Sequence, residues 1–277
     1  MAKIKIAIDA GHGSKTNGKR TPPFTADVDI NGDGRIDIKK GTSYREHYAA
    51  VGVANRLYYI LKARGYDLIK TGWDDSNAKD DPDTPLSTRQ REIKKAKCDY
   101  SISIHFNAFG DGKSFNSANG VSVYMHSKYP GDSKKFAEYV LQELIKGSPQ
   151  KNRGVHSAKL AMCNCKTMAT KASILCELAF MTNQHEAMEL MADEDFWEES
   201  AYEIANAVDR YTNRSSSSKP VPSDNTKKYH TVAAGETLSE IAKRYDMNTV
   251  RIAELNHLEN PDLIYVGQKL LISDATT

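Results

Sequence analysis

The stretch Ile6-Ala7-Ile8-Asp9-Ala10-Gly11-His12-Gly13 is an apolar run that ends abruptly in a histidine flanked by glycines. Residues 3–8 are short, apolar and rich in isoleucine, which is typical of a buried β-strand. The two glycines predict a sharp backbone turn and a close approach by another group. His12 is then expected at the carboxyl end of a strand, where open α/β sheets bind ligands. A lone histidine near a turn is more often structural than a ligand, so a role for His12 requires partners elsewhere in the chain.

Outward from this stretch, segments of strand length alternate with segments of helical periodicity through residue 211. The other expected strands are residues 66–70, 99–104, 121–125 and 172–176. The expected helices are residues 44–64, 86–97 and 133–145 and a last one that ends near Tyr211. Such alternation predicts an α/β domain with a largely parallel, twisted sheet that has helices on both faces.

The amino-acid composition excludes several classes of protein. The 277 residues are 39% hydrophobic and 27% charged, which fits a soluble globular protein and argues against disorder. A net charge of +2 is too small to indicate nucleic-acid binding. No stretch approaches the ~20 apolar residues of a membrane span, so membrane insertion is not expected. Cys98, Cys163, Cys165 and Cys176 form no disulfide framework, and we expect four free thiols.

Residues 14–43 are polar, glycine-rich and too long for an ordinary connection. Within them, acidic and amide side chains match the first, third, fifth and ninth positions of an EF-hand loop, with Gly34 at the sixth. Lys40 replaces the glutamate expected at the twelfth position, and no amphipathic helix precedes the loop. A calcium site and a plain acidic turn therefore both remain open. The residues concerned are Asp29, Asn31, Asp33, Arg35 and Asp37.

Four polar residues stand where predicted elements begin or end: His12, Glu46, His105 and Glu177. Two imidazoles and one carboxylate would leave the open fourth position that a catalytic zinc ion needs. Glu177 would then take a proton from the attacking water and pass it to a leaving amine. Each residue also has a simpler interpretation. Glu46 could favour the helix dipole or complete a capping box with Ser43, and His105 and Glu177 could be ordinary strand-end residues.

Residues 1–212 resemble the catalytic domain of zinc-dependent N-acetylmuramoyl-L-alanine amidases. The resemblance implies that His12, Glu46 and His105 bind one zinc ion and that Glu177 is the catalytic acid/base. The segments that carry it are Ile8-Asp9-Ala10-Gly11-His12-Gly13, Arg45-Glu46, Leu86-Ser-Thr-Arg89, Ser101-Ile-Ser-Ile-His105-Phe-Asn107-Ala108 and Leu175-Cys-Glu177-Leu-Ala-Phe180-Met-Thr-Asn183.

Other positions near these motifs differ from the family pattern or suggest further roles. The insertion at residues 27–41 is longer than expected. Phe106 stands where a smaller or polar residue is common, which predicts an altered groove beside the metal. Arg89 is expected to anchor its helix rather than touch substrate. Asn107, two residues past a ligand, is a candidate substrate contact.

The chain changes character after residue 212. Residues 213–227 have a serine run, two prolines and no apolar periodicity, which predicts a flexible linker. Residues 228–273 are expected to form a small α+β module in the order strand, helix, helix, strand, with segments at 229–232, 237–245, 249–256 and 269–272. Thr237 and Glu240 have the spacing of a capping box at the start of the first helix.

This module resembles a LysM domain. The matching segments are Tyr229-His-Thr-Val232, Gly235-Glu-Thr-Leu238, Ile241-Ala242, Tyr245, Leu255-Asn256, Asn260-Pro261-Asp262, Ile264 and Gly267-Gln268-x-Leu270-x-Ile272. The resemblance implies a shallow groove that binds glycans containing N-acetylglucosamine, although these residues could equally cap helices and form turns. The groove residues would be Gly235, Glu236, Thr237, Leu238, Asn260, Pro261, Asp262 and Ile264.

Together these features predict a peptidoglycan hydrolase that cleaves the amide between N-acetylmuramic acid and L-alanine of the stem peptide. Its partners would be the glycan strand and the stem peptide, and its cofactors one zinc ion and, if the acidic loop binds it, calcium. A zinc peptidase that cuts within the stem peptide and a non-catalytic wall-binding protein are the alternatives. The first residues do not resemble a signal peptide. We therefore expect synthesis in the cytoplasm and action at the bacterial cell wall.

Two settings fit such a chain. One is a phage endolysin that leaves the cell through a separate holin, and the other is a bacterial autolysin whose leader has been removed. The position of Met1, two residues before the first predicted strand, favours the endolysin.

Overall fold

The computed structural model describes residues 3–32, 34–146, 148, 150–214, 228–233, 235–245, 247, 249, 252–253, 256, 258, 263–265 and 268–273. The chain divides into two compact units, Met1–Ser218 and Lys219–Thr277, each with its own core. Most of the predicted linker, residues 215–227, lies outside the described residues. No helix among the described residues has the length and apolar character needed to cross a membrane.

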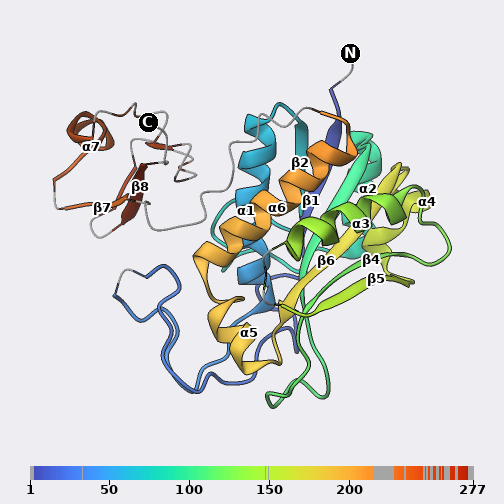
Figure 1. The fold of residues 1–277 in the computed structure, drawn as a ribbon, viewed down its shortest axis with the longest axis horizontal. Helices are drawn as coiled ribbons and strands as arrows, with labels where there is room; N and C mark the ends of the chain where they lie inside the picture. The colour runs from blue at the N-terminus through green and yellow to red at the C-terminus, as the bar shows by residue number, and fades with distance from the viewer. Residues whose placement is uncertain are drawn as a thin grey trace. The chain divides into compact units, whose positions relative to one another are not determined.

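A six-stranded sheet of order β2-β1-β3-β6-β4-β5 forms the centre of the first unit (Figure 1). β2, β1, β3 and β6 pair in parallel, as do β4 and β5, whereas β4 and β6 pair antiparallel. The predicted largely parallel sheet is therefore confirmed. The strands are β1 (Lys5–Ala10), β2 (Asp67–Thr71), β3 (Tyr100–Asn107), β4 (Val121–His126), β5 (Asn152–Ala158) and β6 (Ala172–Phe180).

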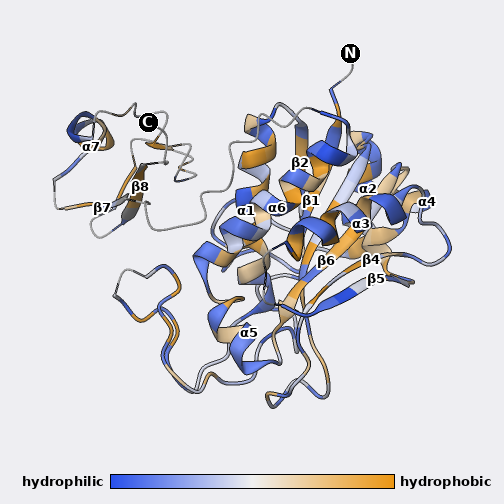
Figure 2. Cartoon of the chain, viewed as in Figure 1, coloured by the Kyte–Doolittle hydropathy of each residue, from blue (hydrophilic) through white to orange (hydrophobic). Residues whose placement is uncertain are grey.

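Helices cover both faces of this sheet, as predicted. On one face α1 (Glu46–Ala63), α3 (Ser133–Leu144) and α6 (Glu194–Tyr211) share a core with Ile6, Ile8 and Ala10 of β1. On the other face α2 (Leu86–Ala96), η1 (Ala161–Cys163) and α4 (Cys165–Met168) pack where Ala7 meets Ile93 and Met168. Figure 2 shows β1 and β6 as largely hydrophobic, β5 as largely hydrophilic and the helices as mixed in hydropathy. Successive β1 residues thus face opposite layers, so Asp9 lies on the α2 side.

Several elements differ from the sequence prediction. β5 is an unpredicted edge strand, because Asn152-Arg-Gly-Val-His-Ser-Ala158 has no apolar alternation and its side chains are half-buried or exposed. η1, α4 and α5 (Gln184–Glu189) were also not predicted. β3 and β6 extend beyond the predicted ends, so His105 and Glu177 lie within strands rather than after them.

The start of α1 also differs from the prediction. α1 begins at Glu46 with Arg45 as its N-cap, and no side chain makes a cap hydrogen bond. The interpretation of Glu46 as a capping-box partner of Ser43 is therefore wrong. The Glu46 carboxylate instead points into the protein, where it is 1% exposed.

The four cysteines of the first unit are free and buried, as expected. Burial raises the pKa of the Cys98 thiol to about 11, and it also raises the pKa values of Cys163 and Cys176. Because the thiolate is the reactive form of cysteine, burial disfavours the reactive state of these thiols.

The second unit has a two-stranded antiparallel sheet of β7 (Lys228–Thr231) and β8 (Lys269–Ser273), and the helix α7 (Leu238–Arg244). The predicted capping box is confirmed: the Glu240 N–H donates to Thr237 Oγ1 over 3.3 Å, and the Thr237 N–H donates to Glu240 Oε2 over 2.9 Å. Much of the predicted helix at 249–256 lies outside the described residues, as does Gly267. The core of this unit includes Val232, Leu238, Ile241, Ile252, Leu270 and Ile272.

Candidate active site

Three predicted ligands lie together although they come from separate elements. His12 follows β1, Glu46 is the first residue of α1, and His105 lies in β3. The distance from His12 Nε2 to Glu46 Oε2 is 3.2 Å, and that from His105 Nδ1 to Glu46 Oε1 is 3.0 Å. The two imidazole rings meet edge to face with centroids 4.9 Å apart. One candidate ligand atom from each residue lies within 4.8 Å of the other two, a separation that suits a single metal ion.

The backbone at His12 departs from the sequence expectation. The left-handed turn occurs at His12 itself, with φ of 65°, whereas Gly11 and Gly13 are not among the positive-φ residues. The glycines instead permit close contacts. A Cβ at Gly11 would overlap the His105 imidazole, and one at Gly13 would lie 2.6 Å from the backbone nitrogen of Asp83. Gly11 therefore leaves room for the imidazole of His105, and Gly13 leaves room for the backbone of Asp83. Neither glycine forms the left-handed turn itself.

The charge states of His12 and Glu46 fit a cation site, whereas in the metal-free protein the Glu46 carboxylate favours the protonated ring of His105. Burial lowers the pKa of His12 and this outweighs the nearby Glu46 carboxylate, which favours the neutral ring that a metal requires. Burial also opposes ionisation of Glu46, but the hydrogen bond from His105 and the proximity of His12 hold its pKa well below the usual range. Burial disfavours the charged form of His105, but Glu46 outweighs it and the His105 pKa is raised.

Two atoms of the cluster are buried without a hydrogen-bond partner: His12 Nε2 and Glu46 Oε2. These two atoms lie 3.2 Å apart but form no hydrogen bond, and buried polar atoms without one are costly and uncommon in folded proteins. An imidazole nitrogen and a carboxylate oxygen are both zinc ligands, and with His105 they form a two-histidine, one-carboxylate set that leaves one coordination position open. The residues present therefore fit a catalytic zinc ion.

Glu177 lies beside this cluster on the neighbouring strand. In the pairing of β3 with β6, His105 is in register with Glu177. Glu177 Oε2 is a further buried atom with no hydrogen-bond partner. Burial raises the pKa of Glu177 to about 8; nearby Glu46 adds to the shift, and His105 and Lys19 oppose it. A carboxyl group with a pKa near neutrality suits general acid–base catalysis.

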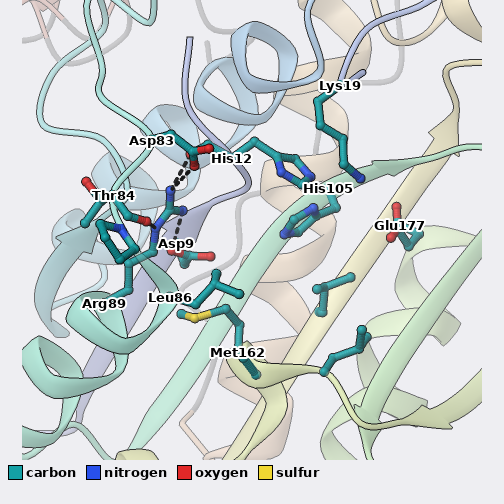
Figure 3. A pocket seen from close by; sticks show the side chains of 14 residues that line it. Asp9, His12, Lys19, Asp83, Thr84, Leu86, Arg89, His105, Met162 and Glu177 are labelled. Atoms are coloured by element: carbon teal, nitrogen blue, oxygen red, sulfur yellow. Dashed lines mark hydrogen bonds and ion pairs between the residues drawn. The ribbon is translucent and has the colours of Figure 1, made fainter. Parts of the chain in front are cut away.

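The imidazoles and Glu177 line a cavity of about 470 Å³ (Figure 3). Its polar side also includes Lys19, and Figure 3 shows the Lys19 side chain extending toward His105 and Glu177. An apolar wall faces these groups, and Leu86 in that wall is exposed to solvent. The cavity therefore combines titratable groups with an apolar surface for a neutral part of a substrate. The apolar wall is formed by Pro85, Leu86, Leu160, Ala161, Met162 and Leu175.

Arg89 has a larger role than the predicted helix anchor. Its guanidinium, 1% exposed, donates to Asp9 Oδ1 over 3.1 Å, to the Ala10 carbonyl over 2.6 Å and to the His12 carbonyl. Asp9 is itself buried and also accepts hydrogen bonds from Thr71 Oγ1 and Ser103 Oγ. Arg89 therefore fixes the end of β1 and the backbone of His12. Two features of the sequence pointed to this role: the segment Leu86-Ser-Thr-Arg89, which resembles the amidase family, and the position of Asp9 at the end of an apolar run.

No role for His47 was predicted from the sequence. Its ring is buried; Nδ1 lies 2.7 Å from the Gly11 carbonyl and Nε2 lies 2.8 Å from Asp81 Oδ2. The Asp81 carbonyl in turn accepts from the Ser14 N–H and hydroxyl. His47 thus ties the loop after β1 to the loop before α2. In the sequence, only the position of His47 next to Glu46 indicated a role for it, because the partners of His47 come from distant parts of the chain.

Asn107 and Phe106 also have defined places. Asn107 Oδ1 accepts from the Ala108 N–H over 2.8 Å, and Asn107 is not among the residues that line the cavity. The expectation that Phe106 alters the groove is wrong, because its side chain is buried in the core on the α1 side of the sheet. Its backbone N–H instead donates to Glu46 Oε1 over 3.2 Å and helps to orient that carboxylate.

The acidic loop of residues 29–37 gives no support to the calcium prediction. Asp29 Oδ2 accepts from the Gly34 N–H over 2.7 Å, and Asp37 Oδ2 accepts from the Ile30 N–H over 2.8 Å. Asp33 lies outside the described residues. Within the part of the chain that the structure describes, the one group of side chains placed to hold a metal is His12, Glu46 and His105.

In the second unit, the described groove residues have structural contacts. Glu236 accepts from the Ala233 N–H over 2.8 Å and pairs with His230 and Arg244, each over 2.6 Å. The hydrogen bond from Ala233, together with these pairs, lowers the Glu236 pKa to about 2. Thr237 caps α7, and Leu238 is buried in the core, while Gly235 has a positive φ and Ile264 is half-buried. Asn260, Pro261 and Asp262 lie outside the described residues.

A largely parallel α/β sheet with two histidines and two buried glutamates gathered beside one cavity is typical of metal-dependent hydrolases. The chain belongs to the N-acetylmuramoyl-L-alanine amidase family, whose model matches residues 6–210. A LysM domain model matches residues 230–273. The chain is accordingly a peptidoglycan hydrolase that cleaves the amide between N-acetylmuramic acid and L-alanine, rather than a peptidase of the stem peptide or a non-catalytic wall-binding protein.

The chain is also similar to individual proteins. The chain is 26% identical over 207 residues to the uncharacterized protein YqiI of Bacillus subtilis, covering 74% of this chain and 84% of that protein. It is 27% identical over 193 residues to the endolysin of Bacillus phage SPP1, covering 70% of this chain and 60% of the endolysin. The solved structure of the amidase AmiC2 of Nostoc punctiforme shares the fold, with a TM-score of 0.58, 23% identity and coverage of 77% of this chain and 99% of that one.

Proposed function

We propose that His12, Glu46 and His105 bind one zinc ion and that Glu177 is the general acid–base of amide hydrolysis. The observation that carries this proposal is the set of three buried atoms in neighbouring side chains that have no hydrogen-bond partner: His12 Nε2, Glu46 Oε2 and Glu177 Oε2. A zinc ion, when bound, supplies Lewis acidity that polarises the scissile carbonyl and acidifies water at its open position.

Glu177 carries the proton in this proposal. Its carboxylate removes a proton from the attacking water, whose oxygen forms the new bond to the carbonyl carbon of the lactyl group. As the carbon–nitrogen bond breaks, the same carboxyl group returns the proton to the nitrogen of L-alanine, so the enzyme ends unchanged. Transfer in both directions is easiest when the pKa of the group lies near the working pH, and burial raises the pKa of Glu177 toward that range.

Asn107 is proposed as a contact to the substrate. Its side-chain oxygen is occupied by the Ala108 N–H. The amide Nδ2 makes no hydrogen bond among the described residues and could donate to a carbonyl of the muramyl peptide.

The LysM domain is proposed to hold the enzyme on its insoluble substrate by binding glycan strands that contain N-acetylglucosamine. The groove would be lined by residues near Gly235 to Leu238 and Asn260 to Ile264. Tyr265, beside this second segment, is exposed, which suits stacking on a sugar ring. Attachment through a second domain raises the effective concentration of the catalytic unit at the wall without new catalytic contacts.

The proposal is tested by digesting purified wall and identifying the new termini by mass spectrometry. Glu177→Ala should keep one zinc per chain and release no L-alanine amino termini, whereas His12→Ala should lose both zinc and cleavage. Glu92→Gln, an exposed carboxylate change on α2, is the matched control and should keep both. Full cleavage by Glu177→Ala would contradict the proposed mechanism.

A further inference from the structure

Lys19 is a cavity cation that the proposed chemistry does not yet use. Its side chain lines the cavity together with His12, His105 and Glu177, and it is 41% exposed. Lys19 Nζ lies 3.9 Å from Glu46 Oε2, too far for a hydrogen bond, and the ammonium makes none among the described residues. Three N–H donors are therefore available to a molecule in the cavity.

The backbone places Lys19 beside the cluster by specific contacts. The Lys19 carbonyl accepts from the Glu46 N–H over 3.1 Å, and Arg20 forms a bridge with Arg45. The Thr21 N–H donates to the Tyr44 carbonyl over 2.8 Å. Residues 19–21 thus run along the chain that leads into α1, so the backbone of Lys19 is held beside Glu46.

The other cation of the cavity cannot serve a substrate in the same way. Arg89 also lines the cavity, but its guanidinium is buried and donates to Thr84, Asp9, Ala10 and His12. Among the described cavity residues, Lys19 is the cation with donors to spare. A divalent cation bound by Glu46 would compete with the ammonium for that carboxylate and leave Lys19 free to contact the substrate.

We propose that the Lys19 ammonium stabilises the negative charge that develops on the carbonyl oxygen of the scissile amide. This inference rests on the proposed function of the same site. Water attack draws the electron pair of the carbonyl onto its oxygen, and no proton moves to or from Lys19 in this step. The reacting carbonyl must lie between the imidazoles and Glu177, which are the groups that Lys19 adjoins in the cavity. A cation beside the reacting bond in a partly enclosed site acts most strongly on charge that appears only in the transition state.

The alternative role is ground-state binding of a peptide carboxylate. The carboxyl group of L-alanine is itself engaged in the next peptide bond, so any free carboxylate of the stem lies at least one residue beyond the scissile amide. A lysine within 3.9 Å of Glu46 is therefore better placed for the reacting bond. The two roles differ in kinetics, because transition-state stabilisation changes kcat and ground-state binding changes KM.

The first test compares the zinc-loaded variants Lys19→Met, Lys19→Arg and Lys15→Met on a soluble muramyl peptide. Lys15 is an exposed lysine of the same segment and serves as the matched control. Lys19→Met should lower kcat by about 10- to 100-fold with KM changed by less than about twofold. Lys19→Arg should recover part of the loss, and Lys15→Met should match the wild type. All three should keep the zinc content and melting temperature of the wild type.

The second test measures binding rather than turnover. The probe is a phosphinate in which a tetrahedral, anionic phosphorus group replaces the scissile carbonyl. Lys19→Met should weaken its binding by about the same factor as kcat. In Glu177→Gln protein, Lys19→Met should leave the affinity for the intact amide substrate unchanged. A higher KM with kcat unchanged, or loss of zinc in Lys19→Met, would overturn the inference.

The wild-type control separates this inference from the proposed function. If the wild type shows no zinc-dependent cleavage of the amide, the proposed function fails. If the wild type and Lys19→Met cleave it with the same kcat, the role of Lys19 alone is wrong.

Discussion

At the scale of single residues, the sequence was most informative where a polar side chain interrupts an apolar run. His12, His105 and Glu177 each stand at such a point, and the structure brings them together with Glu46. The sequence was less informative about backbone and orientation. It placed the turn at the glycines, whereas the left-handed residue is His12. It could not show what approaches Gly11, because the His105 ring comes from a strand more than ninety residues away.

Glu177 gives a pH prediction for the metal-free protein. Its pKa rises to about 8 in the folded state, above the usual value of 4.5, because it is buried. The folded protein thus binds more protons than the unfolded chain between these values, so stability falls as pH rises through this window. The groups that face Glu177 are His105 and Lys19, which favour its ionised form, and Glu46, which opposes it.

The expected result is a steeper loss of stability with pH in the wild type than in Glu177→Gln. The difference should reach at most about 5 kcal/mol between pH 4.5 and 8. Urea unfolding in the presence of a chelator at pH 5 and pH 8.5 measures it. The imidazoles titrate in both proteins, so the comparison is between the two slopes. Equal slopes would show that burial does not raise the pKa of Glu177.

At the scale of elements, periodicity identified the strands that are buried on both faces and the longer helices. It failed at β5, whose edge position leaves no apolar alternation in Asn152–Ala158. It also gave no orientation for β4, because the antiparallel pairing with β6 depends on the path of the chain between them. The roles of Arg89 and His47 were likewise out of reach, since each connects segments distant in sequence.

Arg89 offers a prediction about how α2 supports β1. Arg89→Met would leave Asp9 buried without its cation, and breaking a buried ion pair in this way costs about 3 to 5 kcal/mol. We expect this loss of stability together with weaker zinc binding, because Arg89 also holds the His12 carbonyl. Chemical denaturation and zinc titration measure the two effects.

The double variant Asp9→Asn, Arg89→Met provides the control for charge. It removes both members of the pair and should recover part of the stability lost in Arg89→Met, while zinc binding stays weak. A double variant as unstable as the sum of the two single variants would contradict a direct coupling between Asp9 and Arg89.

At the scale of the whole molecule, the chain consists of two units with separate cores, matched by an amidase model and a LysM model. We predict that a chain ending at Arg214 keeps kcat on a soluble muramyl peptide within about twofold of the full chain. On sedimented wall at low enzyme concentration, its rate should fall by at least about tenfold, because the second binding event is lost. Rates of release of L-alanine amino termini measure both.

A chain ending at Lys227 separates the effect of the linker from that of the LysM domain. It should behave like the chain ending at Arg214. If it digests wall as fast as the full chain, the LysM domain does not contribute to attachment.

The place of β6 in the sheet also bears on how the enzyme is made. β6 lies between β3 and β4, yet it is the last strand of the catalytic unit to leave the ribosome. Until Ala172–Phe180 emerge, β3 and β4 have no partner on their facing edges, and such edges favour association between chains. The nascent chain also lacks Glu177 until that moment. Under the proposed mechanism, completion of the sheet and arrival of the catalytic carboxylate are therefore one event, so a chain that stops before β6 should have no amidase activity.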